Sequence, residues 1–220
     1  LWENPIQSLL HVIYWFKEFL DNIGSDKAML IMHTEPRDPH GQDLQAIIDN
    51  LQLKPGQVVI STQKLPPKEL SYLYNIADCT INISDAEGFG LATLESLACQ
   101  TPIIVNKTGG LQEQIVDNDG NELGIGIDPC SKAIIGSQDV PFIYEDRISK
   151  EDFVSALEKF YNMSQKQRDL LGELGRKHVL KNYGMAQYAG SWYTVFKELF
   201  EECGSWDTRK GYKSWEIFEL

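Results

Sequence analysis

The chain has 220 residues and a mass of 25.0 kDa, and its 42% apolar and 24% charged residues are typical of a globular protein rather than a disordered one. Acidic residues outnumber basic ones by 32 to 20, and the net charge of −12 argues against general binding to nucleic acid or anionic lipid. The length suits one large α/β domain with a helical tail.

The first predicted element is a helix that starts at Asn4-Pro5 and runs to about Leu20. Asn is a good N-cap, and Pro suits the first helical position. The apolar positions at helical spacing are Ile6, Leu9, Leu10, Ile13, Phe16, Phe19 and Leu20. A short apolar run at 28–33 then fits a strand that is buried on both faces.

From residue 44 the pattern alternates between helices and strands. We predict helices over 44–51, 67–77, 91–99 and 111–116, and strands over 58–61, 79–84 and 102–105. Strands that alternate with helices at such short spacing form right-handed βαβ units. The predicted fold class is therefore α/β, a doubly wound and mostly parallel Rossmann-like sheet with helices on both faces and a helical C-terminal tail.

Between residues 121 and 147 the periodicity loosens, and we expect an ordered but irregular excursion. Ser149 and Asp152 have capping-box spacing, which predicts the start of a helix. A further helix to about Asn182 follows, and Gly184 separates it from a last helix that ends near Cys203. We predict a Rossmann-like nucleotide-sugar-binding domain over 1–183 and a C-terminal helix and tail over 184–220.

No apolar stretch reaches the roughly 20 residues that a membrane-spanning helix needs. The first residues contain neither an initiator Met nor a secretory leader, so we expect a piece of a longer protein. The cysteines are Cys79, Cys99, Cys130 and Cys203. Because they are widely spaced and form no Cys-x-x-Cys pair, we predict a reducing, cytoplasmic environment without structural zinc.

The most informative stretch is the turn that joins the strand ending at Ser84 to the next helix. Ligands of parallel sheets bind beyond the carboxyl ends of the strands. Gly88 and Gly90 allow close approach of the backbone, and the N–H groups from Phe89 to Leu91 favour a pyrophosphate. Gly-x-Gly alone is a weak signal, because the same residues serve any tight strand-to-helix turn.

Two acids, Glu87 and Glu95, frame this turn, and they lie roughly two helical turns apart. Both could therefore reach one extended ligand. The simpler interpretation is that Glu87 complements a helix N-terminus and that Glu95 is a solvated helix acid. For an acid pair without further context, that interpretation would be the better one.

The surrounding sequence resembles the C-terminal donor-binding domain of retaining glycosyltransferases with the GT-B fold, most closely glycosyltransferase family 4. The matching elements are the Glu-x7-Glu pair with its internal Gly-Phe-Gly-Leu, Leu94-Glu-Ser-Leu-Ala98, Pro102-Ile-Ile-Val105 and the Gly109-Gly110-Leu111 turn. The resemblance extends from about Asn4 to Arg176, and it is densest between Ser84 and Asp117.

The resemblance implies a role for each matching residue. Glu87 would contact hydroxyls of the donor sugar and is the implied catalytic residue, while Glu95 would hold the ribose of the nucleotide. Carboxylates that accept hydrogen bonds from vicinal hydroxyls make chemical sense. The other implied donor-binding residues are Gly88, Phe89, Gly90 and Leu91 for the sugar and phosphates, Gly109 and Gly110 beside them, and Thr62, Gln63 and Leu65 along the base.

The implied reaction transfers a hexose from a nucleoside-diphosphate sugar to a glycan, lipid or small-molecule acceptor, with retention at the anomeric carbon. In the family's usual front-face route, the leaving phosphate helps to deprotonate the acceptor. The resemblance implies no metal and no other cofactor. It places the protein in glycan or polysaccharide biosynthesis.

The chain also departs from the family pattern. Trp2, Glu3 and Asn4 offer no cation where an Arg and a Lys usually neutralise the departing pyrophosphate, and no first strand is recognisable. The acceptor site and the usual catalytic histidine belong to an amino-terminal domain that is absent here. We therefore expect a donor-binding half with little or no activity alone, because positioning two substrates is most of the catalysis.

Other residues suggest weaker hypotheses. A metal site formed by His33, Glu35, Asp38 and His40 is less favoured than a solvated loop, because prolines separate the ligands. Lys107 could reach a phosphate or could be a plain exposed lysine. The tail aromatics, including Trp215 and Phe218, are expected to dock on the absent domain rather than to bind RNA or a membrane.

A second function class stays open beside the transferase. A non-catalytic nucleotide-sugar-binding module, or a GT-B-like sugar-nucleotide epimerase, would bind the donor without acceptor-dependent turnover. A third interpretation, in which the chain is purely structural, requires that Glu87 and Glu95 contact no ligand. The sequence leaves the sugar, the base and the acceptor undetermined, because their recognition rests on a few local contacts.

Overall fold

The computed structural model describes residues 6–38, 41–117, 119–136 and 138–211. The helices are α1 (Ile6–Ile23), α2 (Leu44–Asn50), α3 (Pro67–Ile76), α4 (Leu91–Ala98), α5 (Leu111–Ile115), α6 (Lys150–Tyr161), α7 (Gln165–Asn182) and α8 (Met185–Cys203). The strands are β1 (Leu30–His33), β2 (Val58–Ser61), β3 (Thr80–Asn82), β4 (Ile103–Asn106), β5 (Gly124–Ile127), β6 (Ser131–Ile135) and β7 (Ile143–Arg147). Outside the described residues lie the Asn4-Pro5 start signal, Trp2, Glu3, His40, Trp215 and Phe218.

The α/β fold class is confirmed, with parallel strands and intervening helices. The strands form two parallel sheets, β1-β2 and β3-β4-β5, where the sequence predicted one. In the described residues, β1 pairs with β2 alone and β3 with β4 alone. In doubly wound folds the first strand lies in the middle of the sheet.

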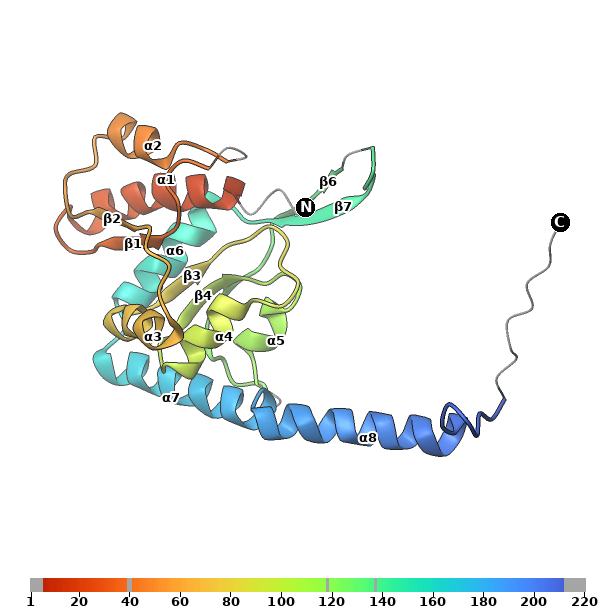
Figure 1. The fold of residues 1–220 in the computed structure, drawn as a ribbon. Helices are drawn as coiled ribbons and strands as arrows, with labels where there is room; N and C mark the ends of the chain where they lie inside the picture. The colour runs from red at the N-terminus through yellow and green to blue at the C-terminus, as the bar shows by residue number, and fades with distance from the viewer. Residues whose placement is uncertain (1–5, 39–40, 118, 137, 212–220) are drawn as a thin grey trace. The chain divides into compact units, whose positions relative to one another are not determined.

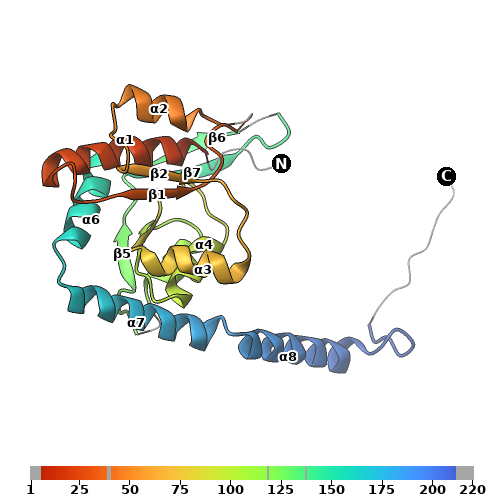
Figure 2. The same ribbon diagram turned by 60° about the vertical axis from the view of Figure 1, so that its left-hand side comes forward.

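Helices cover both faces of the strands. In both views α1 and α2 lie on one side of β1 and β2, and α3 and α4 lie on the other (Figure 1 and Figure 2). The predicted apolar face of α1 is buried at Ile13, Phe16 and Leu20, and it packs in one core with α6 and the strands. The capping of α6 is confirmed, because the Ser149 hydroxyl accepts from the Asp152 amide at 3.0 Å.

The prediction of an irregular excursion over 121–147 is wrong, because this segment contains β5, β6 and β7. Strand β5 reads Gly-Ile-Gly-Ile, and its glycines hid the strand pattern. A Cβ at Gly124 would overlap the carbonyl oxygen of Ile103 on β4, so glycine is what allows these strands to pair. Strands β6 and β7 form an antiparallel hairpin.

Helix α4, which carries Glu95, is supported from behind by α7. A Cβ at Gly172 would overlap the Gln100 carbonyl oxygen, and one at Gly175 would lie 2.5 Å from the Leu97 side chain. The guanidinium of Arg176 donates to the Ala98 carbonyl at the end of α4. The two glycines therefore let α7 approach closely, which fixes the position of α4.

The chain divides into two compact units, Leu1–Lys177 and His178–Leu220. The second unit contains α8, whose exposed aromatic residues contact one another along the helix. The Tyr188 and Trp192 rings are 6.3 Å apart, and the Trp192 and Phe196 rings 5.2 Å. Among the described helices of the whole chain, none is long and apolar enough to cross a membrane.

Candidate functional site

The turn between β3 and α4 depends on a glycine at its last position. Gly90 has φ +87 and ψ 61, a left-handed conformation that L side chains rarely adopt. A Cβ there would also lie 2.6 Å from the Leu111 side chain and 2.8 Å from the Thr93 hydroxyl. The predicted glycine turn is therefore present, and Gly90 allows it to pack against α5.

The turn after β4 packs directly on the turn after β3. Gly109 has φ +45, and a Cβ on it would overlap the carbonyl oxygen of Glu87. The amide of Gly110 donates to that same carbonyl at 3.2 Å, and a Cβ on Gly110 would lie 2.7 Å from the Phe89 carbonyl oxygen. The structure thus brings together the two glycine turns that the sequence assigned to one site. We call them the interlocked turns, residues 84–90 and 107–110.

A buried polar pair that sequence reasoning missed holds the first of these turns. The Gln114 side chain is fully buried, and its Nε2 donates to the carbonyls of Phe89 and Gly90. Its Oε1 accepts from the Thr93 hydroxyl at 2.6 Å. The signal in the sequence was a Gln between Leu111 and Ile115 on the inner side of a short helix, since a buried amide requires partners.

Glu87 is partly exposed, and its carboxylate folds back onto its own turn. Oε1 accepts from the Gly90 amide at 3.1 Å and from the Phe89 amide at 3.4 Å. These are two of the amides that the sequence assigned to a pyrophosphate. In the structure they orient Glu87, as the simpler interpretation expected. Each carboxylate oxygen has two lone pairs, so Glu87 retains the capacity to accept from a ligand hydroxyl.

Glu95 lies on the exposed face of α4, one helical turn after the exposed Leu91. Its Oε2 accepts from the Tyr74 hydroxyl of α3 at 2.9 Å. Burial of the ring, and then this donation to Glu95, raise the pKa of Tyr74 above its ordinary value. Neither acid of the predicted pair is buried, so both stay accessible to a ligand.

A network of charged residues joins the first turn to β7. Arg147 of β7 pairs with Asp85 at 3.0 Å and also with the buried Glu145. The Asp146 amide donates to the Asp85 carbonyl at 2.7 Å, which ties β7 to the turn. Burial raises the pKa of Asp85, and Arg147 opposes that rise. Sequence reasoning missed this network because it predicted no strand at β7.

Asn106, at the end of β4, joins the same elements from within. Its side-chain amide donates to the Ser84 carbonyl at 2.9 Å and to the Asp146 carbonyl at 2.7 Å. The Thr108 hydroxyl donates to the Asp146 carboxylate at 2.8 Å. The carboxyl ends of β3 and β4 are thereby fastened to β7.

The loop after β2 is far more open. Thr62 and Gln63 are exposed and Leu65 is partly exposed. The loop begins at Ser61, whose hydroxyl is hydrogen-bonded to His33 Nδ1 at 3.0 Å.

The other candidate residues are accounted for as follows: Lys107 pairs with Asp128 at 3.0 Å. In the part of the chain that the structure describes, no three His, Cys, Asp or Glu residues gather as metal ligands would. The four cysteines are unbridged.

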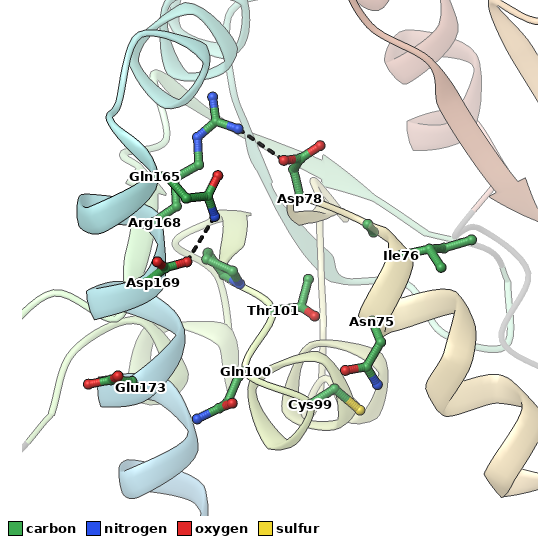
Figure 3. Close-up of a pocket in the computed structure, with 12 residues that line it drawn as sticks. Asn75, Ile76, Asp78, Cys99, Gln100, Thr101, Gln165, Arg168, Asp169 and Glu173 are labelled. Carbon is green, nitrogen blue, oxygen red and sulfur yellow. Dashed lines mark hydrogen bonds and ion pairs between the residues drawn. The ribbon is translucent and has the colours of Figure 1, made fainter.

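Two hollows lie away from these residues. One, of about 460 Å³, lies at the amino ends of β3 and β4 and is lined by residues that include Asp78, Thr101 and Arg168 (Figure 3). Asp78 pairs with Arg168 at 3.0 Å, and Gln165 donates to Asp169 at 2.8 Å. The second, of about 490 Å³, is lined by residues that include Ser25 and Gln57. Because parallel sheets bind ligands at the carboxyl edge, the interlocked turns remain the candidate site.

Residues 37–178 match the family described as glycosyl transferases group 1. A D-inositol 3-phosphate glycosyltransferase from Acidothermus cellulolyticus is 38% identical over 78 residues, which are 36% of this chain and 17% of that protein.

Solved structures show the same fold. A sucrose-phosphate synthase from Thermosynechococcus elongatus superposes with a TM-score of 0.64 at 19% identity, over 86% of this chain and 42% of that one. The C-terminal domain of a glycosyl transferase group 1 family protein from Francisella tularensis superposes with a TM-score of 0.58 at 21% identity, over 80% of both chains. The chain thus covers less than half of the first relative and the first structure, but most of the isolated C-terminal domain.

Proposed function

The chain belongs to the family of glycosyl transferases group 1, and on this premise we propose that it is the donor-binding half of a retaining glycosyltransferase. It would take part in moving a hexose from a nucleoside-diphosphate sugar to an acceptor. The observation that carries the proposal is the interlocking of two glycine turns at the carboxyl ends of neighbouring parallel strands, with one acid on the turn and one on α4.

In this proposal the two acids bind the two ends of the donor. Glu87, oriented by its own turn, accepts from hydroxyls of the sugar and serves as the catalytic residue. Glu95, one turn beyond Leu91 on an exposed face, accepts from the ribose hydroxyls. Ionised carboxylates are acceptors only, which suits vicinal diols. The sugar and phosphates lie against Gly88 to Leu91 and Gly109 to Gly110, and the base lies along Thr62, Gln63 and Leu65.

The proposed chemistry comes from the resemblance to retaining glycosyltransferases. We propose a front-face reaction with retention, in which the departing phosphate takes the acceptor's proton. We propose that no metal takes part. The acceptor belongs to glycan biosynthesis on the cytoplasmic side, in keeping with the unbridged cysteines.

We further propose that the partner is an amino-terminal domain of the same GT-B protein. Support comes from the relatives, whose length is more than twice the part that matches this chain. A strand from that side of the protein would pair between β1 and β3, where the parallel sheet is divided. The exposed aromatic face of α8 would pack on the partner domain. The isolated chain is then expected to bind donor but to transfer little.

Calorimetric titration of this chain with UDP, GDP and ADP tests the proposal. At least one nucleoside diphosphate is expected to bind, and Glu95→Ala is expected to weaken that binding roughly tenfold or more through loss of charge-assisted hydroxyl contacts. Glu69→Ala, which removes an exposed acid from α3, is the matched control and is expected to leave the affinity unchanged. Unchanged binding in Glu95→Ala would contradict the proposed site.

A further inference from the structure

Glu95 has a side-chain partner, Tyr74, that lies outside the motifs on which the family resemblance rests. The Tyr74 hydroxyl, on α3, donates to Glu95 Oε2 at 2.9 Å across the gap between two helices. This is a contact between residues 21 positions apart in the chain. An exposed glutamate on a helix otherwise samples several rotamers, each of which points its carboxylate differently. The hydrogen bond therefore selects one of them.

Tyr74 is itself fixed at its backbone. Its carbonyl accepts from the Thr101 hydroxyl at 2.7 Å and from the Ala77 amide at 3.2 Å. Thr101 is buried in the connection between α4 and β4. The end of α3 is thus bound to the connection that follows α4. The helix that carries Tyr74 and the helix that carries Glu95 are therefore held next to each other.

The hydroxyl of Tyr74 stays protonated, and so acts as a hydrogen-bond donor, over the whole physiological pH range. Half-burial of the ring raises its pKa, and the neighbouring carboxylate raises it further, because both disfavour a phenolate. The bond thus occupies part of one oxygen of Glu95, and the other oxygen, Oε1, remains available for hydroxyls of a ligand.

We propose that Tyr74 is a positioning residue for nucleotide binding: it holds the Glu95 carboxylate in the orientation that receives the vicinal ribose hydroxyls. This inference rests on the proposed function. An acid that is already oriented loses less conformational freedom when a ligand binds, so the same contact yields more affinity. Tyr74 itself contacts no ligand in this proposal, and its effect passes entirely through Glu95.

The test is a double-mutant cycle on the whole chain, read by calorimetric titration. The variants are Tyr74→Phe, Glu95→Ala and both together. The ligands are UDP, GDP and ADP, together with the 2′,3′-dideoxy form of whichever binds most tightly. Tyr72→Phe is the matched control, because Tyr72 is an exposed tyrosine on the same helix. Thermal unfolding of each variant separates loss of fold from loss of positioning.

We expect Tyr74→Phe to weaken binding of the nucleoside diphosphate roughly fivefold, the effect of one hydrogen bond. In the Glu95→Ala background the same substitution is expected to change nothing further. With the dideoxy ligand the effect is expected to vanish, because no hydroxyls remain for Glu95 to accept from. Tyr72→Phe is expected to bind as the unsubstituted chain does.

Each other outcome has a definite meaning. If Glu95→Ala weakens binding but Tyr74→Phe does not, the positioning role is overturned and the proposed function stands. If Tyr74→Phe weakens binding of the dideoxy ligand equally, or weakens nucleotide binding by the same factor in the Glu95→Ala background, Tyr74 has a general structural role and the inference is overturned. If no nucleoside diphosphate binds, or Glu95→Ala has no effect, the proposed function fails, and the inference fails with it.

Discussion

The loops that leave β2 and β3 both start at the carboxyl ends of parallel strands, but they are held in very different ways. The backbone of the turn after β3 is held by several hydrogen bonds: its carbonyls accept from Gln114 and Gly110, and its amides donate to Glu87. In the loop after β2, Thr62, Gln63 and Lys64 are exposed, and the loop is anchored where Ser61 meets His33.

In the proposed donor site, this difference would separate two tasks. Residues that meet the sugar and phosphates must be positioned closely, because catalysis depends on geometry, and a buried polar network supplies that rigidity. Residues that lie along a base need only a few contacts, and those can come from an adaptable loop. Substitutions in the rigid turn are therefore expected to have larger effects on stability than substitutions in the open loop.

The largest effect is expected from Gly109→Ala, which drives a Cβ into the Glu87 carbonyl at a positive φ. The interlocked turns would have to separate, and we expect the free energy of unfolding to fall by at least about 3 kcal/mol, measured by urea denaturation. Gly88→Ala is the control from the same turn, because nothing lies within 4 Å of a Cβ there. Equal losses in both variants would show that the two turns are not rigidly packed.

The next effect concerns the buried pair of Gln114 and Thr93. Gln114→Leu removes the donor to the Phe89 and Gly90 carbonyls, and we expect a loss of about 1–3 kcal/mol in stability. Because Thr93→Val removes the other partner, the double variant is expected to lose less than the sum of the two single losses. Additive losses in denaturant unfolding would contradict a coupled pair.

A smaller effect on the free energy of unfolding is expected from a change in pH, because the carboxyl of Asp85 titrates. Burial raises the pKa of its carboxyl above the ordinary 3.8, with Arg147 in opposition. Because the folded-state pKa is raised, the protonated carboxyl of Asp85 stabilises the folded chain. This contribution is complete below pH 3.8 and is lost as the pH rises through the folded-state pKa.

The variant Asp85→Asn provides a partner that does not titrate. The free energy of unfolding of the unsubstituted chain, relative to Asp85→Asn, is expected to fall as the pH rises above the ordinary pKa of 3.8. Thermal unfolding at several pH values measures this slope. A difference that rises with pH would show that Arg147 outweighs burial at this site.

The same contrast decides what could be predicted from the sequence. The interlocked turns were predictable because Gly90 and Gly109 stand where the backbone needs glycine, and because apolar runs reveal buried strands. Strands β5 to β7 were not predictable, because the glycines of β5 obscure its pattern and its pairing with β4 is decided by distant contacts.

The side-chain partners were harder to predict than the turns. Nothing local in the sequence links Tyr74 to Glu95 or Arg147 to Asp85, because each pair joins elements that only the folded chain brings together. The acids themselves were found from their spacing around a glycine turn. Their roles toward a donor stay predictions, and the titrations above test them.

The smallest effect on stability is expected in the open loop, from Gln63→Ala. Since Gln63 is exposed, we expect the free energy of unfolding to change by less than about 0.5 kcal/mol. If this loop lies along the base, the same substitution is expected to change the ratio of the Kd values for UDP and GDP by about threefold or more, the effect of one hydrogen bond. Gln187→Ala, an exposed glutamine on α8, is the control for both measurements. An unchanged ratio would remove the base from this loop, whereas a large loss of stability would show that the loop is held as firmly as the turn after β3.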